Sequence, residues 1–202
     1  MSLKQRFITK GIRQFGHPRG LTGRLVGHFM AHRGSNRRRS LWVVDLLEPR
    51  PTERVLEIGF GPGIAIRALA ERAGHVYGVD HSREMVRQAR RRAKAGNVTL
   101  THASVADLPA LEPLDAIMSV NSLGFWPDPD QRLVELRTLL RPGGRIAIAS
   151  QPRCPGATAE TTAKAGKEIQ DRLTKAGFTQ PRVEILPLDP PVACVLAVND
   201  DR

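Results

Sequence analysis

The stretch Val55–Gly63, VLEIGFGPG, decides the fold of this chain. Its first half is an apolar β-type run that stops at glycine, and a helical pattern begins directly after its last residue. The three glycines are spaced two apart, at Gly59, Gly61 and Gly63. Glycines at a strand-to-helix turn allow left-handed backbone angles, and they let a ligand approach more closely than a Cβ atom would permit. The sequence therefore predicts a site for a nucleotide-type cofactor at this turn.

Beyond residue 50, short apolar runs alternate with amphipathic patterns. The runs predict strands at residues 54–58, 75–79, 98–102, 114–120 and 145–149. The amphipathic patterns predict helices at residues 64–73, 82–95, 129–140 and 157–176. This alternation is typical of a parallel sheet with helices on both faces. Two last runs, 178–186 and 192–198, leave no room for a crossover helix, so they predict an antiparallel hairpin. We expect an α/β fold, a doubly wound sheet that is mostly parallel.

The 202 residues fit one domain, 1–202, with a core over residues 46–202. Residues 1–45 precede the first strand and read as two or three short helices, with a break at residues 16–20. Ligands in open α/β sheets lie beyond the carboxyl ends of the strands. We therefore expect residues 1–45 to form a helical lid over that edge.

The formal net charge of +11 lies almost entirely in this first segment. Residues 1–44 contain ten Lys or Arg residues and no Asp or Glu, whereas the rest of the chain is close to neutral. Such a segment could contact nucleic acid, an anionic membrane surface or an acidic substrate, or it could simply be a solvated surface.

No apolar run approaches the length of a membrane span, and the start of the chain shows no secretory signal pattern, so we expect a cytoplasmic protein. Cys154 and Cys194 show no metal-ligand spacing, and no metal is expected.

Two acidic residues narrow the choice of cofactor. The dinucleotide-binding fingerprint G-x-G-x-x-G would need glycine at Ile64, whereas this chain has G-x-G-x-G with Glu57 two residues before it. Asp80 ends the second predicted strand, where a carboxylate can accept hydrogen bonds from both hydroxyls of an adenosine ribose. Ser82 is better placed than Asp80 to cap the next helix.

These segments, with GVD at 78–80 and LRPGG at 140–144, together resemble the class I S-adenosylmethionine-dependent methyltransferases. The chain is most similar to their small-molecule branch, typified by the methyltransferases of quinone biosynthesis, and the resemblance covers about residues 50–150. It implies a Rossmann-like sheet, S-adenosylmethionine as cofactor and S-adenosylhomocysteine as product. It also implies that LRPGG is a helix end and a tight turn.

The resemblance further implies roles for individual residues. By this resemblance, Glu57 and the glycine turn hold the methionine moiety, and Asp80 holds the ribose. The segments around residues 81–85 and 104–105 contact the adenine. Many relatives carry Asp where this chain has Ser104, so the backbone amide of Val105 is the expected contact. The residues assigned to the cofactor are Glu57, Gly59, Phe60, Gly61, Gly63, Asp80, His81, Met85, Ser104, Val105 and Asn121.

An acceptor pocket is expected next to the cofactor. Phe125 and Trp126 follow the fourth strand and could line it, although Trp126 reads equally well as a packing anchor of its loop. Gln151 and Arg153 follow the fifth strand, and Arg153 could bind an acidic group of the acceptor. His17 is the candidate general base, with a polar loop residue as the alternative reading; no base is needed unless the acceptor must lose a proton.

The sequence therefore predicts methyl transfer to an O, N or C atom of a small molecule, such as a secondary metabolite or a quinone-like or lipid-like compound. Three alternatives stay open. One is methylation of RNA or protein, with the basic first segment as the docking surface. Another is a non-catalytic module that binds S-adenosylmethionine. NAD-dependent oxidoreduction is the weakest, because Ile64 breaks the dinucleotide fingerprint.

Overall fold

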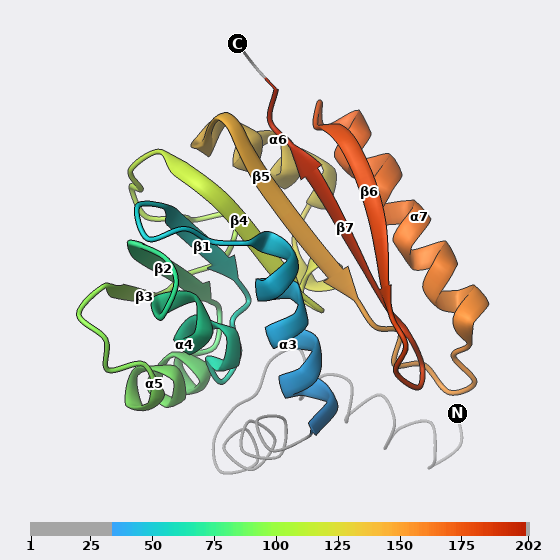
Figure 1. Ribbon diagram of the computed structural model, residues 1–202, viewed down its shortest axis with the longest axis horizontal. Helices are drawn as coiled ribbons and strands as arrows, with labels where there is room; N and C mark the ends of the chain where they lie inside the picture. The colour runs from blue at the N-terminus through green and yellow to red at the C-terminus, as the bar shows by residue number, and fades with distance from the viewer. Residues whose placement is uncertain (1–33, 201–202) are drawn as a thin grey trace.

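A computed structural model describes residues 34–200, which form one seven-stranded sheet covered by helices on both faces (Figure 1). The strand order is β3-β2-β1-β4-β5-β7-β6. The strands are β1 Arg54–Ile58, β2 His75–Asp80, β3 Val98–His102, β4 Leu114–Val120, β5 Leu140–Ser150, β6 Thr179–Leu186 and β7 Val192–Val198. None of the helices between residues 34 and 200 has the length and apolarity that crossing a membrane requires.

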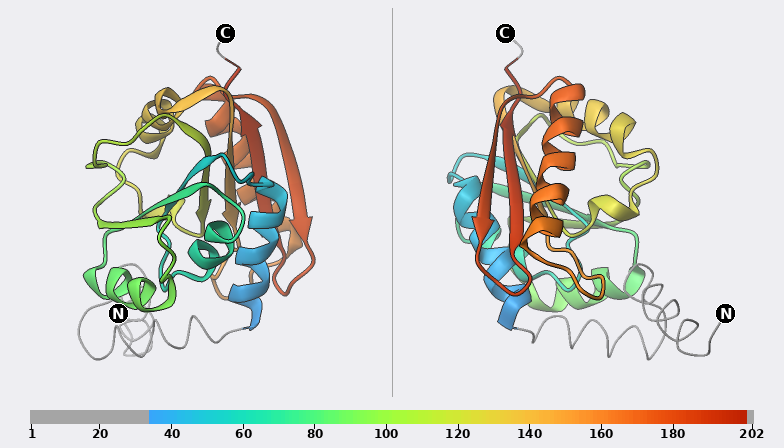
Figure 2. Two further views of the ribbon diagram at one scale, coloured as in Figure 1. Left: turned by 60° about the vertical axis from the view of Figure 1, so that its left-hand side comes forward. Right: turned by 90° about the vertical axis from the view of Figure 1, so that its right-hand side faces the viewer.

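The helices form two layers (Figures 1 and 2). One face carries α3 Gly34–Leu47, α4 Ile64–Ala70 and α5 Arg83–Arg92, and the other carries α6 Pro129–Leu139 and α7 Ala159–Lys175. A short 3₁₀ turn, η1 Leu123–Phe125, follows β4. Each layer buries its own hydrophobic cluster against the sheet. The sandwich of helix, sheet and helix is the architecture that the alternation of strands and helices predicts.

Strand pairing confirms the predicted topology. Strands β1 to β5 pair in parallel, and β7 pairs antiparallel with both β5 and β6. The chain winds outward from β1 to β3 and then returns to place β4 on the other side of β1. Ligands of open α/β sheets bind at such a reversal point, outside the carboxyl ends of the strands. The candidate site is therefore expected at the ends of β1, β2 and β4.

The segment LRPGG differs in part from its prediction as a helix end and tight turn. Helix α6 ends at Leu139, and residues 140–144 already belong to β5. Gly143 N–H donates to Asn199 O, and Asn199 N–H donates to Gly144 O, both at 2.7 Å. The predicted helix end is confirmed, because Leu140 is the C-cap of α6. The predicted tight turn is instead the start of β5, because Leu140 pairs with Leu114 and Asn199 pairs with residues 143 and 144. Gly143 still has a left-handed φ of 76°.

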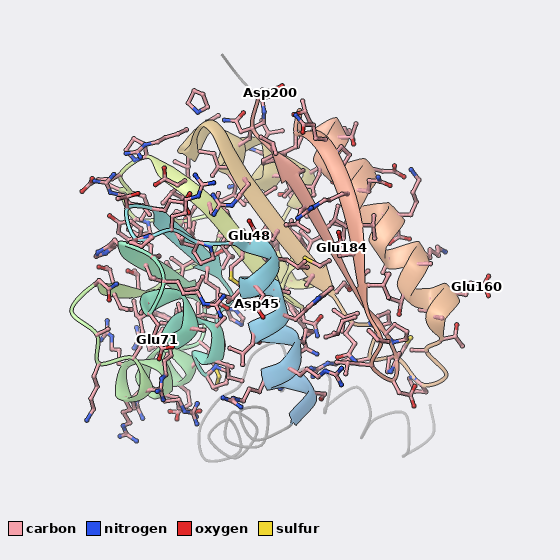
Figure 3. All side chains as sticks on the ribbon, viewed as in Figure 1. Asp45, Glu48, Glu71, Glu160, Glu184 and Asp200 are labelled. Carbon is pink, nitrogen blue, oxygen red and sulfur yellow. The ribbon has the colours of Figure 1, made fainter. Side chains whose placement is uncertain are left out.

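Helix α3 is the described part of the predicted lid, and it packs on a face of the sheet. Val43, Val44 and Leu47 are fully buried in the hydrophobic cluster of the α4 side. Asp45 lies on the outer side of α3 (Figure 3). It accepts a hydrogen bond of 2.6 Å from Arg72, just beyond the end of α4. Of the residues in α3, only those in its first half lie near the carboxyl edge of the sheet.

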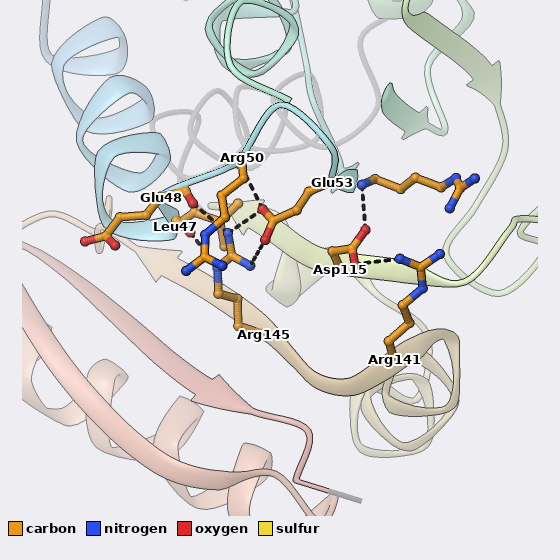
Figure 4. A network of polar contacts seen from close by, with 8 residues as sticks. Leu47, Glu48, Arg50, Glu53, Asp115, Arg141 and Arg145 are labelled. Carbon is orange, nitrogen blue, oxygen red and sulfur yellow. Dashed lines mark hydrogen bonds and ion pairs between the residues drawn. The ribbon is translucent and has the colours of Figure 1, made fainter. Parts of the chain in front are cut away.

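Arg145 fixes the end of α3 at the opposite edge, where the strands begin (Figure 4). Its guanidinium donates to the carbonyls of Leu47 (2.6 Å) and Glu48 (2.7 Å), which a helix C-terminus leaves without intrahelical partners. It also binds both carboxylate oxygens of Glu53, at 2.9 and 2.7 Å. Burial acts to raise the pKa of Glu53, but the contacts with Arg145 and Arg50 hold it below its usual range. This network anchors α3 and so sets the position of the residues in its first turns.

Candidate functional site

A cavity of about 380 Å³ opens at the carboxyl ends of β1, β2 and β4, where the topology predicts it. Its walls bring together most of the site residues that the sequence predicts. These are Gly59, Gly61, Asp80, His81, Met85, Ser104, Val105, Asn121, Phe125, Trp126 and Arg153. The predicted general base, His17, lies outside the described residues.

The glycine turn has the left-handed conformation that its sequence predicts. The φ angles are 71° at Gly59, 54° at Gly61 and 80° at Gly63. A Cβ atom at Gly59 would lie 2.4 Å from the Cβ atom of Ser122, whereas one at Gly61 would meet nothing within 4 Å. Packing therefore requires glycine at position 59. At Gly61 the backbone angle requires it, and this residue presents bare backbone to the cavity.

Asp80 shapes this turn from the end of β2. Its Oδ2 accepts a hydrogen bond from Gly61 N–H, and its Oδ1 accepts one from Ser82 N–H, both at 2.8 Å. Burial raises the pKa of Asp80, and these two hydrogen bonds oppose the shift. Ser82 caps α5 by accepting the N–H of Met85, as the sequence predicts. The carboxylate of Asp80 thus stays at the cavity wall instead of capping the helix.

Two buried polar atoms near the turn have no hydrogen-bond partner among the described residues: Oε2 of Glu57 and Nδ2 of Asn121. The side chain of Glu57 is only 3% exposed, and burial, with a smaller contribution from the charge of Asp80, raises its pKa to about 8. Asn121 has a φ of 56°, and its Oδ1 accepts the N–H of Gln151 at 2.7 Å. Unsatisfied buried polar groups are costly, and a bound ligand is a common explanation for them.

Three predicted cofactor residues do not line the cavity: Glu57, Phe60 and Gly63. Phe60 is buried in the hydrophobic cluster of the α4 side, and its ring would collide with a Cβ atom on Gly78 of β2. Gly63 packs on Ala89 of α5, where a Cβ atom would lie 2.7 Å from the alanine Cβ. Phe60 and Gly63 therefore position the turn, and the ring of Phe60 packs in the core and does not line the cavity.

Arg39 of α3 lines the cavity although the sequence analysis did not select it. It is only 4% exposed, and its guanidinium donates to the side-chain oxygens of Gln151 and, at 2.6 Å, of Asn36. Both partners are neutral amides, and Nε has no partner within residues 34–200. Burial, with the charge of Arg153 as a second cause, lowers the pKa of Arg39 to about 9. Arg39 is thus a buried cation without a counter-ion among the described residues.

One sequence signal could have identified Arg39. It precedes Val43 and Leu47 by one and two helical turns, so the three side chains share one face of α3. The charge run Arg37–Arg39 concealed this pattern, because such runs usually form solvated faces.

A second cavity of about 600 Å³ adjoins the first, and Phe125 and Arg153 line both. Gln151 lines only the second, and its Nε2 donates to Pro190 O at 2.7 Å. Phe125 is 49% exposed, whereas Trp126 is buried and donates its indole N–H to Ser122 Oγ at 3.0 Å. Trp126 thus serves as a packing anchor and also forms a wall of the first cavity.

Comparison with known proteins agrees with this geometry. The family model described as "Methyltransferase domain" matches residues 55–144. An uncharacterized methyltransferase, YdaC of Bacillus subtilis (strain 168), is 31% identical over 157 residues, which cover 76% of this chain and 86% of that protein. The ubiquinone biosynthesis O-methyltransferase of Aeromonas salmonicida (strain A449) is 33% identical over 120 residues, covering 57% of this chain and 50% of the relative. The chain thus spans most of the first relative and half the length of the second.

Among solved structures, the N-methyltransferase NodS of Bradyrhizobium japonicum WM9, in complex with S-adenosyl-L-homocysteine, has the same fold. Its TM-score is 0.68 at 17% sequence identity, and the match covers 85% of this chain and 91% of that one.

Proposed function

Because this chain belongs to the class I S-adenosylmethionine-dependent methyltransferases, we propose that it transfers a methyl group from that cofactor to an O, N or C atom of a small molecule. The observation that carries the proposal is the pair of adjoining cavities. One is walled by the glycine turn and Asp80, and the other adjoins it through Phe125 and Arg153. The likeness to an enzyme of ubiquinone biosynthesis supports a quinone-like, lipid-like or secondary-metabolite acceptor.

The first cavity suits the adenosine part of the cofactor. Each carboxylate oxygen of Asp80 accepts one backbone N–H and keeps a lone pair that could accept a ribose hydroxyl. We assign the adenine to the wall formed by His81, Met85, Ser104 and Val105. Ser104 Oγ already accepts the N–H of Ala106 at 3.1 Å, so the Val105 amide is the better candidate for the adenine edge.

The groups without partners suit the charged methionine part. An α-ammonium group would satisfy Oε2 of Glu57, and an α-carboxylate would supply the counter-ion that Arg39 lacks within residues 34–200. Asn121 Nδ2 is a further donor at the same edge of the sheet. The α-ammonium group of the ligand thus matches the buried acid Glu57, and its α-carboxylate matches the buried cation Arg39.

The bound cofactor would supply a methyl group on a positively charged sulfur, which is a strong electrophile. What remains for the protein is to align the acceptor and to exclude water. The side chains of Ile58, Val79 and Val120 give the first cavity apolar walls, and Phe125 and Trp126 add aromatic surface that favours a cation. No general base is assigned within residues 34–200, and His17 stays a prediction.

A thermal-shift comparison of S-adenosylhomocysteine with NAD tests the cofactor assignment. We expect stabilisation by the former only, and Asp80→Asn should remove most of the shift. Stabilisation by NAD alone would contradict the assignment.

The acceptor class is tested by methyl transfer from labelled S-adenosylmethionine into a cell extract that is fractionated into small molecules, lipids, RNA and protein. Label in the small-molecule or lipid fraction is the expected result. Label confined to RNA or protein would overturn the proposal, and would favour docking through the basic first segment. The cytoplasmic location and the single domain over residues 1–202 stay predictions.

A further inference from the structure

Two arginine side chains meet where the two cavities join. Nη2 of Arg39 and Nη2 of Arg153 both donate to Oδ1 of Asn36, at 2.6 and 2.7 Å. Like charges held at one neutral oxygen repel each other, and the charge of Arg153 contributes to the lowered pKa of Arg39. A positive potential is therefore concentrated at this junction.

The two arginines differ in what they face. Arg39 is buried and lines only the first cavity, whereas Arg153 lines both cavities. Under the proposed function, on which this inference rests, the cofactor brings one carboxylate, and Arg39 is the buried cation that it would neutralise. Arg153 is then the cation presented to the acceptor.

We propose that the second cavity selects acceptors that carry a carboxylate or phosphate group, and that Arg153 binds this group. A guanidinium can donate two parallel hydrogen bonds to either kind of anion, which fixes orientation as well as affinity. The half-exposed ring of Phe125 lines the same cavity and offers an apolar surface to the rest of the acceptor. The acceptor is thus a small organic anion with an apolar body.

Among the described residues, Asp80 and Asp189 are the acidic side chains that line the two cavities. Asp80 binds two backbone N–H groups at the end of β2. Asp189 also lines the second cavity, but it is exposed, so water and salt screen its charge. Gln151, which forms the wall between Arg39 and Pro190, is neutral.

The test uses the full-length protein saturated with S-adenosylhomocysteine, and NMR titration with three probes of similar shape: benzoate, phenyl phosphate and benzyl alcohol. We expect at least one of the anions to bind roughly tenfold or more tightly than the neutral alcohol. Arg153→Gln should remove this preference, and Arg153→Lys should restore part of it. The matched control is Arg38→Gln, which removes an exposed charge from α3 that lines neither cavity.

The outcomes separate this inference from the proposed function. Failure of the wild-type protein to bind S-adenosylhomocysteine would reject the proposed function. Normal cofactor binding combined with equal or tighter binding of benzyl alcohol, or with no binding of either anion, would reject only the anionic acceptor.

An equal loss in Arg38→Gln and Arg153→Gln would likewise reject it, because a general charge effect would then suffice. In the extract assay, the labelled product should be retained by an anion exchanger at pH 8, and a neutral product would contradict the inference.

Discussion

Replacing Glu57 with glutamine should make the ligand-free protein more stable at pH 8 while weakening cofactor binding. Burial raises the pKa of Glu57 to about 8 in the folded protein, whereas the ordinary value is 4.5. The folded state therefore holds a proton that the unfolded state releases. Stability from this group is fully present below the unfolded pKa and is lost as the pH rises toward the folded pKa.

The size of the effect follows from these two values. As the pH rises from 5 to 8, the raised pKa of Glu57 alone should lower the free energy of unfolding by about 3 kcal/mol. Because the total stability of a domain is about 5–15 kcal/mol, this loss is readily measured. Glutamine has nearly the same shape and does not ionise, so Glu57→Gln should lose this part of the pH dependence.

Urea unfolding at pH 5, 6.5 and 8, followed by circular dichroism without cofactor, measures the difference. Glu168→Gln, which changes an exposed glutamate of α7, is the control and should keep the wild-type dependence. Calorimetry should then show about a tenfold or greater loss of affinity for S-adenosylhomocysteine in Glu57→Gln, since a charged hydrogen bond is lost. Equal pH dependence in Glu57→Gln and the wild type would refute the reasoning.

Three further predictions concern the turn, the buried cation and the anchor of α3. Gly59→Ala should destabilise the fold by about 2 kcal/mol or more in urea unfolding, because its Cβ atom would collide with Ser122, and Ser122→Gly in the same chain should recover part of the loss. Arg39→Gln should weaken binding of S-adenosylhomocysteine about tenfold or more in calorimetry, because it removes the buried cation that would pair with the carboxylate of the cofactor, and unchanged affinity would contradict that role. Arg145→Gln should cost about 2–3 kcal/mol of stability at pH 7, because it removes the ion pair with Glu53. The cost should be smaller below pH 4, because the pKa of Glu53 is lowered and the ion pair is lost as its carboxylate is protonated. Equal losses at both pH values in urea unfolding would contradict this.

The local sequence was sufficient for the features that depend on neighbouring residues. The glycine spacing predicts the turn because left-handed angles are a property of each residue. Ser82 caps α5 as predicted because a helix cap depends on neighbouring residues, whereas the ribose contact of Asp80 stays a prediction. The parallel pairing of β1 to β5 follows from the alternation of strands and helices, since parallel strands need crossover connections.

Features that depend on distant pairing were missed. Arg39 belongs to the site only because α3 packs against the sheet and brings it to Gln151, 112 residues away. Phe60 sits between glycines of the turn, yet its ring joins the core because Gly78 leaves room for it. The first residues of β5 form a strand through distant partners, because Leu140 pairs with Leu114 and Asn199 pairs with residues 143 and 144.

The hydrogen bond from Gly61 to Asp80 has a consequence for the rate of binding. This hydrogen bond holds the middle of the glycine turn in its left-handed conformation before any ligand binds. The close packing of Gly59 against Ser122 holds the start of the turn. Ordering a flexible loop costs about 1–2 kcal/mol of conformational entropy per residue, and here that loss occurs during folding. We therefore expect this turn to take up the cofactor without a slow rearrangement of its own backbone.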